Sequence, residues 1–241
     1  MHIPDGYLSP QTYLPLYGVS FAFWAIALRK LKSELSVKHI PYLAMTAAFS
    51  FIIQMFNIPI PGGTTGHAVG AGIAALLLGP WTAVIAVSVA LIIQAIVFGD
   101  GGITAIGANC FNMAVVMPFT SYWVFKLAMG KSKNLSSPLF SKGGKGGFAR
   151  LSIASFLSGY IGLSISAVIT AVEFGIQPII AADADGKPLY APYPLSVAVP
   201  VMALEHLLLF GIIEGVVTAM LLKYFLKHEP DAVYAIRGDR Q

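Results

Sequence analysis

Long apolar segments separated by short polar connections follow one another along the whole chain. A helix that crosses a bilayer needs about 20 mostly apolar residues, and charges, prolines and glycines bound such segments here. The pattern predicts an all-α membrane protein with seven transmembrane helices, near residues 12–29, 41–57, 67–78, 80–98, 104–128, 150–177 and 195–226. The third and fourth helices are divided at Gly79-Pro80, because the apolar run from Ala68 to Phe98 is too long for one untilted span.

The basic residues gather in three clusters beside the apolar segments. They follow the first segment, flank the connection after the fifth, and end the chain: Arg29, Lys30, Lys32 and Lys38; Lys126, Lys131, Lys133, Lys142, Lys145 and Arg150; Lys223, Lys227, Arg237 and Arg240. The positive-inside rule places all three clusters in the cytoplasm. With an odd number of helices, this arrangement predicts an N-terminus outside the cell and a cytoplasmic C-terminus.

The composition agrees with a bilayer as the solvent. Of the 241 residues, 56% are hydrophobic and 11% are charged, and the mean hydropathy is +0.75, which lies outside the range of soluble domains. The basic clusters account for the net charge of +4, so we expect no nucleic-acid role. We expect one integral membrane domain over residues 1–241, with a flexible cytoplasmic linker of glycine and lysine over 130–149.

The N-terminus begins MHIPDGYLSPQ and carries prolines and an aspartate before any long apolar run. It lacks the basic region of a cleavable signal peptide. Because the initiator methionine is normally removed only before a small second residue, we expect Met1 to keep its free amine. We interpret residues 1–11 as a metal-chelating segment, for a reason of spacing.

A histidine at position 2 can chelate a metal with three nitrogens. The Met1 amine and the His2 amide nitrogen close a five-membered ring around the metal, and the same amide with the His2 imidazole closes a six-membered ring. Ni(II) and Cu(II) favour such planar nitrogen donation. His67 can supply the fourth donor, because it follows the flexible PGGTTG stretch on the same outer face. Taken singly, each histidine is more often incidental, His2 as an exposed residue and His67 as a helix cap.

Three polar residues are candidates to support this site. We expect Asp5, Asp100 and Asn109 near the metal, where a carboxylate or amide would fix the orientation of a metal-binding imidazole. The alternative for Asp5-Gly6 and for Asp100-Gly101 is a simple turn. Asn109 and Asn112 lie about one helical turn apart in an apolar helix, so both should face the bundle interior.

Other polar residues within the apolar segments offer a rival site. They are Gln54, Gln94, Glu173, Glu205, His206 and Glu214. Glu205 and His206 lie near the middle of the last helix, where an ionisable pair would suit a secondary transporter or channel. An intramembrane enzyme is disfavoured, because the sequence has no HExxH motif, no paired carboxylates and no nucleophile with a plausible base.

Three motifs resemble those of a known family. MHIPDG at the start, GGTTGHAVGAGIAALLLGPWTA at 62–83 and FGDGGITAIGANCFNMAVV at 98–116 are similar to the NikM/CbiM family, the substrate-binding components of energy-coupling-factor nickel and cobalt transporters. The resemblance implies that the Met1 amine, the His2 amide and imidazole, and the His67 imidazole form a square plane around Ni(II) or Co(II). The metal would be a transported substrate, and the chain would catalyse no reaction.

The same resemblance implies partners and a location. They are a transmembrane coupling subunit, two ABC ATPase subunits, and a small separate accessory membrane subunit in place of the extra helices of fused members. The chain has no GxxxxGK[ST] motif of its own. Ala44, Ala47 and Ala48 form a small-residue patch that would face the coupling subunit, or would pack within the chain. The expected location is a bacterial or archaeal cell membrane.

Overall fold

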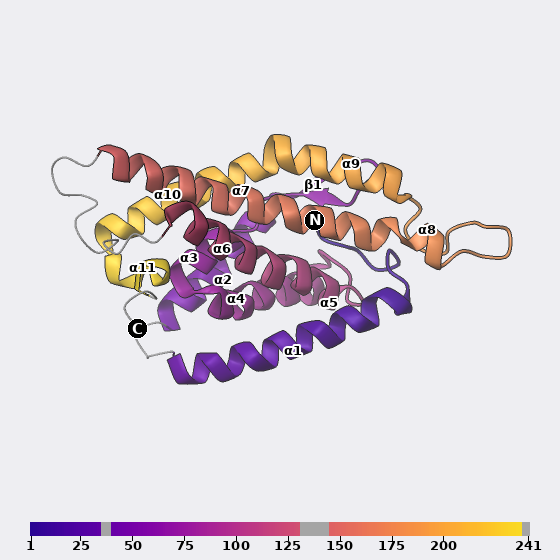
Figure 1. Ribbon diagram of the computed structural model, residues 1–241. Coiled ribbons are helices and arrows are strands. Elements are labelled where there is room, and N and C mark those ends of the chain that lie inside the picture. Colours follow the sequence, from indigo (N-terminus) through magenta and orange to yellow (C-terminus); the bar gives the residue numbers. More distant parts are fainter. Residues whose placement is uncertain (35–39, 131–144, 238–241) are drawn as a thin grey trace.

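The computed structural model describes residues 1–34, 40–130 and 145–237, which form a bundle of helices (Figure 1). Its α-helices are α1 (Pro10–Glu34), α2 (Ile40–Gln54), α3 (Ala71–Leu78), α4 (Pro80–Ile93), α5 (Ile106–Asn109), α6 (Met117–Met129), α7 (Lys145–Gly175), α8 (Gln177–Ile180), α9 (Leu195–Glu205), α10 (Gly211–His228) and α11 (Tyr234–Arg237). The strands β1 (Ile58–Pro59) and β2 (Thr65–Gly66) pair antiparallel. The chain also has π-helical turns η2 (Gln94–Phe98), η3 (Cys110–Val116) and η4 (His206–Phe210), and a 3-10 turn η5 (Pro230–Ala232).

The helical class predicted from the apolar pattern is confirmed, and helix occupies part of each of the seven predicted ranges. Three helical runs in the described part are long and apolar enough to cross a membrane: Pro80–Phe98, Phe148–Ile180 and Leu195–His228. Ile40–Gln54 is a shorter apolar helix. The number of crossings and the orientation of the termini stay predictions.

The helix ends that carry the basic clusters lie together. In Figure 1 the end of α1, the start of α7 and α11 are at one end of the bundle, and α8 with the loop that follows it is at the other. This is the arrangement that a single cytoplasmic face requires. The predicted linker at 130–149 falls mostly on residues outside the described part of the chain.

The break between α3 and α4 falls at Gly79-Pro80, as predicted. Gly79 has φ of 83° and Pro80 is the first residue of α4, where its missing N–H costs nothing. The prediction that the third helix starts at residue 67 is wrong, because α3 starts at Ala71. Gly70 has φ of 75°, and this left-handed conformation separates the helix from the turn that carries His67.

The N-terminal segment is part of the core. Met1, Ile3 and Leu8 are buried in the main apolar cluster, which also contains Phe174 and Met202. Figure 1 places the N-terminus within the bundle beside β1. The first residues are therefore held inside the helices, where the site is formed.

Candidate metal centre

Three hydrogen bonds to the backbone of Ile3, together called the clamp on Ile3, hold the N-terminal segment in the bundle. Asn109, at the end of α5, accepts a hydrogen bond from the Ile3 N–H at 2.8 Å and donates one to the Ile3 carbonyl at 3.1 Å. The Gly102 N–H donates to the same carbonyl at 2.9 Å. Because the backbone of a residue inside the bundle needs partners, these three bonds allow Met1 and His2 to be buried at 0% and 3% exposure.

The loop after η2 forms a second contact with the segment. The exposed Asp5 carboxylate accepts hydrogen bonds from the N–H groups of Ile103, at 3.1 Å, and Thr104, at 2.8 Å. A Cβ at Gly102 would lie 2.3 Å from the Asp5 nitrogen, so this close approach requires glycine. Asp5, expected beside an imidazole, instead joins the segment to this loop.

Thr65 in β2 binds both backbone nitrogens of the expected chelate. The Met1 amine donates to the Thr65 carbonyl oxygen and to Thr65 Oγ1, the latter at 3.0 Å. The His2 N–H donates to the same Oγ1 at 3.2 Å. The Met1 amine and the His2 amide nitrogen therefore face the same side of the segment. Two nitrogens of one chelate ring must do so to bind the same metal ion.

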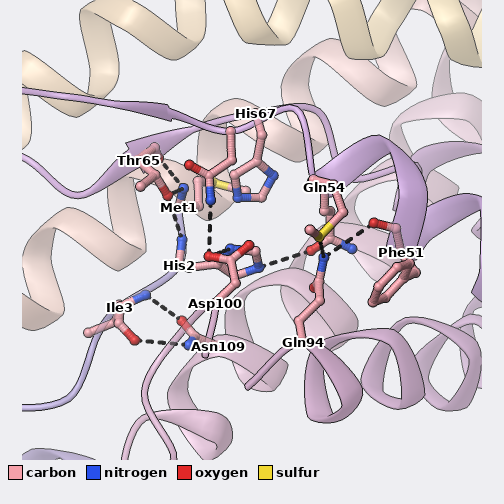
Figure 2. Close-up of polar contacts among 12 residues, drawn as sticks. Met1, His2, Ile3, Phe51, Gln54, Thr65, His67, Gln94, Asp100 and Asn109 are labelled. Atoms are coloured by element: carbon pink, nitrogen blue, oxygen red, sulfur yellow. Dashed lines mark hydrogen bonds and ion pairs between the residues drawn. The ribbon is translucent and has the colours of Figure 1, made fainter. Parts of the chain in front are cut away.

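The two histidine rings lie against each other (Figure 2). The ring centroids of His2 and His67 are 4.5 Å apart, with an interplanar angle of 28°. His67 Nδ1 is 3.0 Å from the Ala68 carbonyl, and His2 Nε2 is 3.1 Å from Gln54 Oε1. The other ring nitrogens, His2 Nδ1 and His67 Nε2, are buried and have no hydrogen-bond partner among the residues that the structure describes.

Asp100 supplies a negative charge beside His2. Its Oδ1 lies 3.0 Å from His2 Nδ1, although the contact lacks the direction of a hydrogen bond. The Asn57 amide donates to the same oxygen at 3.0 Å. Burial raises the pKa of the Asp100 carboxyl, but His2, Asn57 and the Met1 amine together outweigh burial and bring the pKa below 3.8. The carboxylate is thus ionised at neutral pH.

Burial changes the protonation of the other nitrogens. It lowers the pKa of the Met1 amine from 8.0 to about 4, against the opposing charges of Asp100 and Glu205. It also brings the pKa of His67 well below 6.5, and the charges of the Met1 amine, His2 and His206 act in the same direction. The Met1 amine and His67 are therefore neutral at pH 7, with lone pairs available to a metal.

Nitrogen atoms, rather than a cluster of acidic or thiol side chains, could hold a metal here. Within the described ranges, no three His, Cys, Asp or Glu side chains are gathered as metal ligands. The Met1 amine, the His2 amide, His2 Nδ1 and His67 Nε2 together supply four nitrogens, of which the two ring nitrogens have no hydrogen-bond partner in the described chain. This donor set fits Ni(II), Cu(II) or Co(II).

The other predicted polar residues are separate from the clamp on Ile3. Asn112 donates to the Glu173 carboxylate at 2.7 Å instead of holding the N-terminal segment. His206 begins η4, is buried, and has its Nδ1 2.8 Å from the Met202 carbonyl, whereas the neighbouring Glu205 is half-buried. Adjacent helical residues point about 100° apart, which accounts for this difference.

Three residues of the site were not identified from the sequence: Gln54, Asn57 and Thr65. Gln54 was only recognised as a polar residue in an apolar helix, and this was the available signal. Asn57 and Thr65 lie in the connection between α2 and α3, where polar residues are ordinary. Their roles depend on how the β1–β2 hairpin folds back on the N-terminal segment.

The fold and the site define a helical membrane protein whose own N-terminus is buried in a nitrogen-lined centre. The chain belongs to the CbiM family, described as the cobalt uptake substrate-specific transmembrane region, whose model matches residues 2–232. This membership confirms the family that the three sequence motifs indicated.

Two relatives are similar to this chain over almost its whole length. A fused nickel transport protein NikMN of Rhodobacter capsulatus is 53% identical over 231 residues, which are 96% of this chain and 63% of that protein. A putative metal transport protein of Methanocaldococcus jannaschii is 44% identical over 232 residues, 96% of this chain and 94% of that protein. The chain thus spans less than two thirds of the length of the fused relative.

A solved structure has the same fold. The crystal structure of a truncated transition metal transporter is 43% identical, with a TM-score of 0.86, and the match covers 95% of this chain and 99% of that one. At this identity and coverage, the arrangement of helices is that of a transmembrane metal transporter.

Proposed function

We propose that this chain captures Ni(II) or Co(II) on the outer side of the cell membrane, as the substrate-specific component of an energy-coupling-factor importer. The observation that carries the proposal is the meeting of Met1, His2 and His67 inside the bundle. It leaves His2 Nδ1 and His67 Nε2 buried and without hydrogen-bond partners in the described chain. Membership of the CbiM family supports the same function.

Capture follows from the chemistry of these nitrogens. The Met1 amine is neutral at pH 7 and donates its lone pair without first losing a proton. The His2 amide gives up its proton to the solvent, and His2 Nδ1 and His67 Nε2 complete a square plane. Deprotonation of a peptide amide requires a strongly polarising ion, which favours Ni(II) over Co(II). Asp100 balances the positive charge that remains.

The proposed importer requires other subunits. In this proposal, separate ABC ATPases would hydrolyse ATP, and a coupling subunit would transmit the motion. Ala44 and Ala48 are exposed on α2 and Ala47 is partly so, which leaves this patch open to the coupling subunit. A small accessory membrane subunit is a further proposed partner, because the Rhodobacter capsulatus relative is named a fused nickel transport protein.

An extended N-terminus tests the site. Cleavage of a tag to leave two extra glycines before Met1 moves the amine out of the five-membered ring, so tight nickel binding should be abolished in calorimetry. A chain with two glycines added after Gln241 is the matched control and should bind as the wild type does. Unchanged affinity in the N-terminally extended chain would overturn the site. Metal import by vesicles that lack ATPases would favour the rival route through Glu205 and His206.

A further inference from the structure

We propose that Gln54 is a positioning residue that fixes the tautomer of His2, keeping the proton on Nε2 and leaving Nδ1 free for the metal. The inference rests on the proposed function, in which the His2 imidazole is a metal ligand. It extends that function to a residue on α2 that touches no backbone nitrogen of the chelate.

Only one ring nitrogen of His2 can complete the chelate. The ring that contains the metal and the His2 amide nitrogen passes through Cα, Cβ, Cγ and Nδ1, which makes six members. Nε2 lies on the far side of the imidazole and cannot close this ring. A neutral imidazole carries its proton on one nitrogen and a lone pair on the other, so the chelate requires the Nε2–H tautomer.

A directed chain of hydrogen bonds leads to His2 from Val69. The Ser50 hydroxyl has one proton and donates it to the Val69 carbonyl at 2.8 Å. Ser50 Oγ must therefore accept the bond from Gln54 Nε2, also at 2.8 Å, and the same amide nitrogen donates to the Ser50 carbonyl at 3.0 Å. Both hydrogens of the Gln54 amide are used in this way, and the orientation of the amide is fixed.

The Gln54 oxygen consequently faces His2. Gln54 Oε1 lies 3.1 Å from His2 Nε2, and both residues are buried (Figure 2). An amide oxygen can only accept a hydrogen bond, so His2 Nε2 carries the proton. In the neutral ring, His2 Nδ1 is then the nitrogen with the lone pair; it has no hydrogen-bond partner of good geometry in the described chain, although Asp100 Oδ1 lies 3.0 Å away.

Asp100 makes this function of Gln54 necessary. Its carboxylate, 3.0 Å from His2 Nδ1, would by itself attract the proton to that nitrogen, where a metal would have to displace it. Gln54 opposes this shift from the other side of the ring. His67 shows the complementary arrangement, because its Nδ1 donates to the Ala68 carbonyl and Nε2 keeps the lone pair.

The Val69 end of the chain is also fixed. Glu214 on α10 accepts hydrogen bonds from the N–H groups of Val69 at 2.8 Å and Gly70 at 3.0 Å. The Val69 carbonyl that directs Ser50 therefore belongs to a turn held by a buried carboxylate. The same turn carries His67, so one short segment determines the orientation of both imidazoles.

Nitrogen NMR tests the tautomer without any metal. In metal-free protein labelled with 15N-histidine, long-range 1H–15N spectra distinguish a protonated ring nitrogen from one with a lone pair. The chain has five histidines, and the His2 signals are identified by their loss in His2→Ala. We expect wild-type His2 to have its proton on Nε2. A proton on Nδ1 would overturn the proposal, and this measurement needs no Gln54 variant.

Substitution of Gln54 tests the consequence for binding. Gln54→Leu, or Gln54→Met if the leucine variant does not fold, should move the His2 proton to Nδ1 and weaken nickel binding by about 10- to 100-fold, as for other partners of metal ligands. Gln94→Leu is the matched control, because Gln94 is also buried but its amide donates to the Phe51 carbonyl at 3.3 Å. Equal nickel affinity and an unchanged His2 tautomer in Gln54→Leu would refute the role.

The outcomes separate this inference from the proposed function. If His2→Ala binds nickel as tightly as the wild type, the proposed metal site is wrong, whatever the tautomer. If His2→Ala loses binding but Gln54→Leu retains it together with the wild-type tautomer, the metal site stands and the role of Gln54 fails.

Discussion

The imidazole rings of His2 and His67 stack with their centroids 4.5 Å apart. One ring belongs to the N-terminal segment and the other to the turn before α3, so they meet only when the segment is inserted in the bundle. Insertion depends in turn on the clamp between Ile3 and Asn109. Capture of a metal by both rings would therefore stabilise the inserted segment, because a ligand that binds one state shifts the equilibrium toward it.

Loss of the His67 ring should remove one of four proposed ligands. We expect His67→Ala to weaken nickel binding at least about 100-fold, because a plane of four donors loses one member and the cavity that remains is buried. Isothermal calorimetry measures the change, with His228→Ala as the control, since His228 is exposed near the end of α10. Similar affinities in the two variants would show that His67 is not a ligand.

A methyl group at Gly102 should displace the N-terminal segment. The Cβ of Gly102→Ala would lie 2.3 Å from the Asp5 backbone nitrogen, whereas Gly18, in α1, has no atom of the described chain within 4 Å of the equivalent position. We expect Gly102→Ala to increase hydrogen exchange at residues 1–9 and to weaken nickel binding about 10-fold or more. Gly18→Ala should leave both unchanged. An undisturbed segment in Gly102→Ala would contradict the close packing.

The charge of Asp100 should favour the bound metal. Asp100→Asn keeps the size of the side chain but removes the negative charge 3.0 Å from His2 Nδ1, so we expect nickel binding to weaken by about 10-fold. Asp185→Asn is the control, because Asp185 is exposed in the loop after α8. Salt weakens interactions between exposed charges most. If raised salt weakens nickel binding by the same factor in Asp100→Asn and in the wild type, long-range attraction of nickel by Asp100 is excluded as the cause of the difference in affinity.

Much of the fold could be predicted from the sequence, because apolar length and proline or glycine breaks are local properties. The break at Gly79-Pro80 is an example. The start of α3 was misplaced because Gly70 looks no different in sequence from the glycine at 72, which lies within the helix. Only the folded chain shows which glycine adopts a left-handed conformation.

The residues of the candidate site could also be predicted only in part. His2 was identified from its distance to the free amine, which is fixed by covalent geometry alone. Gln54 and Thr65 could not be assigned, because their contacts with residues 1 and 2 join parts of the chain more than 50 positions apart. Asp5 was expected beside an imidazole, yet the fold directs it to the backbone at Ile103 and Thr104.

The inserted N-terminal segment should become less stable as the pH falls. The Met1 amine has a pKa of 8.0 when exposed and about 4 in the bundle, so the inserted state binds fewer protons than the released state between these values. Its contribution to stability is therefore fully present above pH 8 and is lost as the pH falls toward 4. The loss between pH 8 and pH 6 amounts to about 2 kcal/mol.

Below pH 6.5 His67 should add to this loss. Burial also lowers the pKa of His67, well below 6.5. A second proton then favours the released segment, and the stability of the inserted segment falls more steeply as the pH decreases. Hydrogen exchange of residues 1–9 in metal-free protein, corrected for intrinsic rates, measures both steps. In His67→Asn the first step should remain and the steepening below pH 6.5 should disappear. Protection that is constant from pH 8 to pH 6 would mean that the amine is not held inside the bundle in its neutral form.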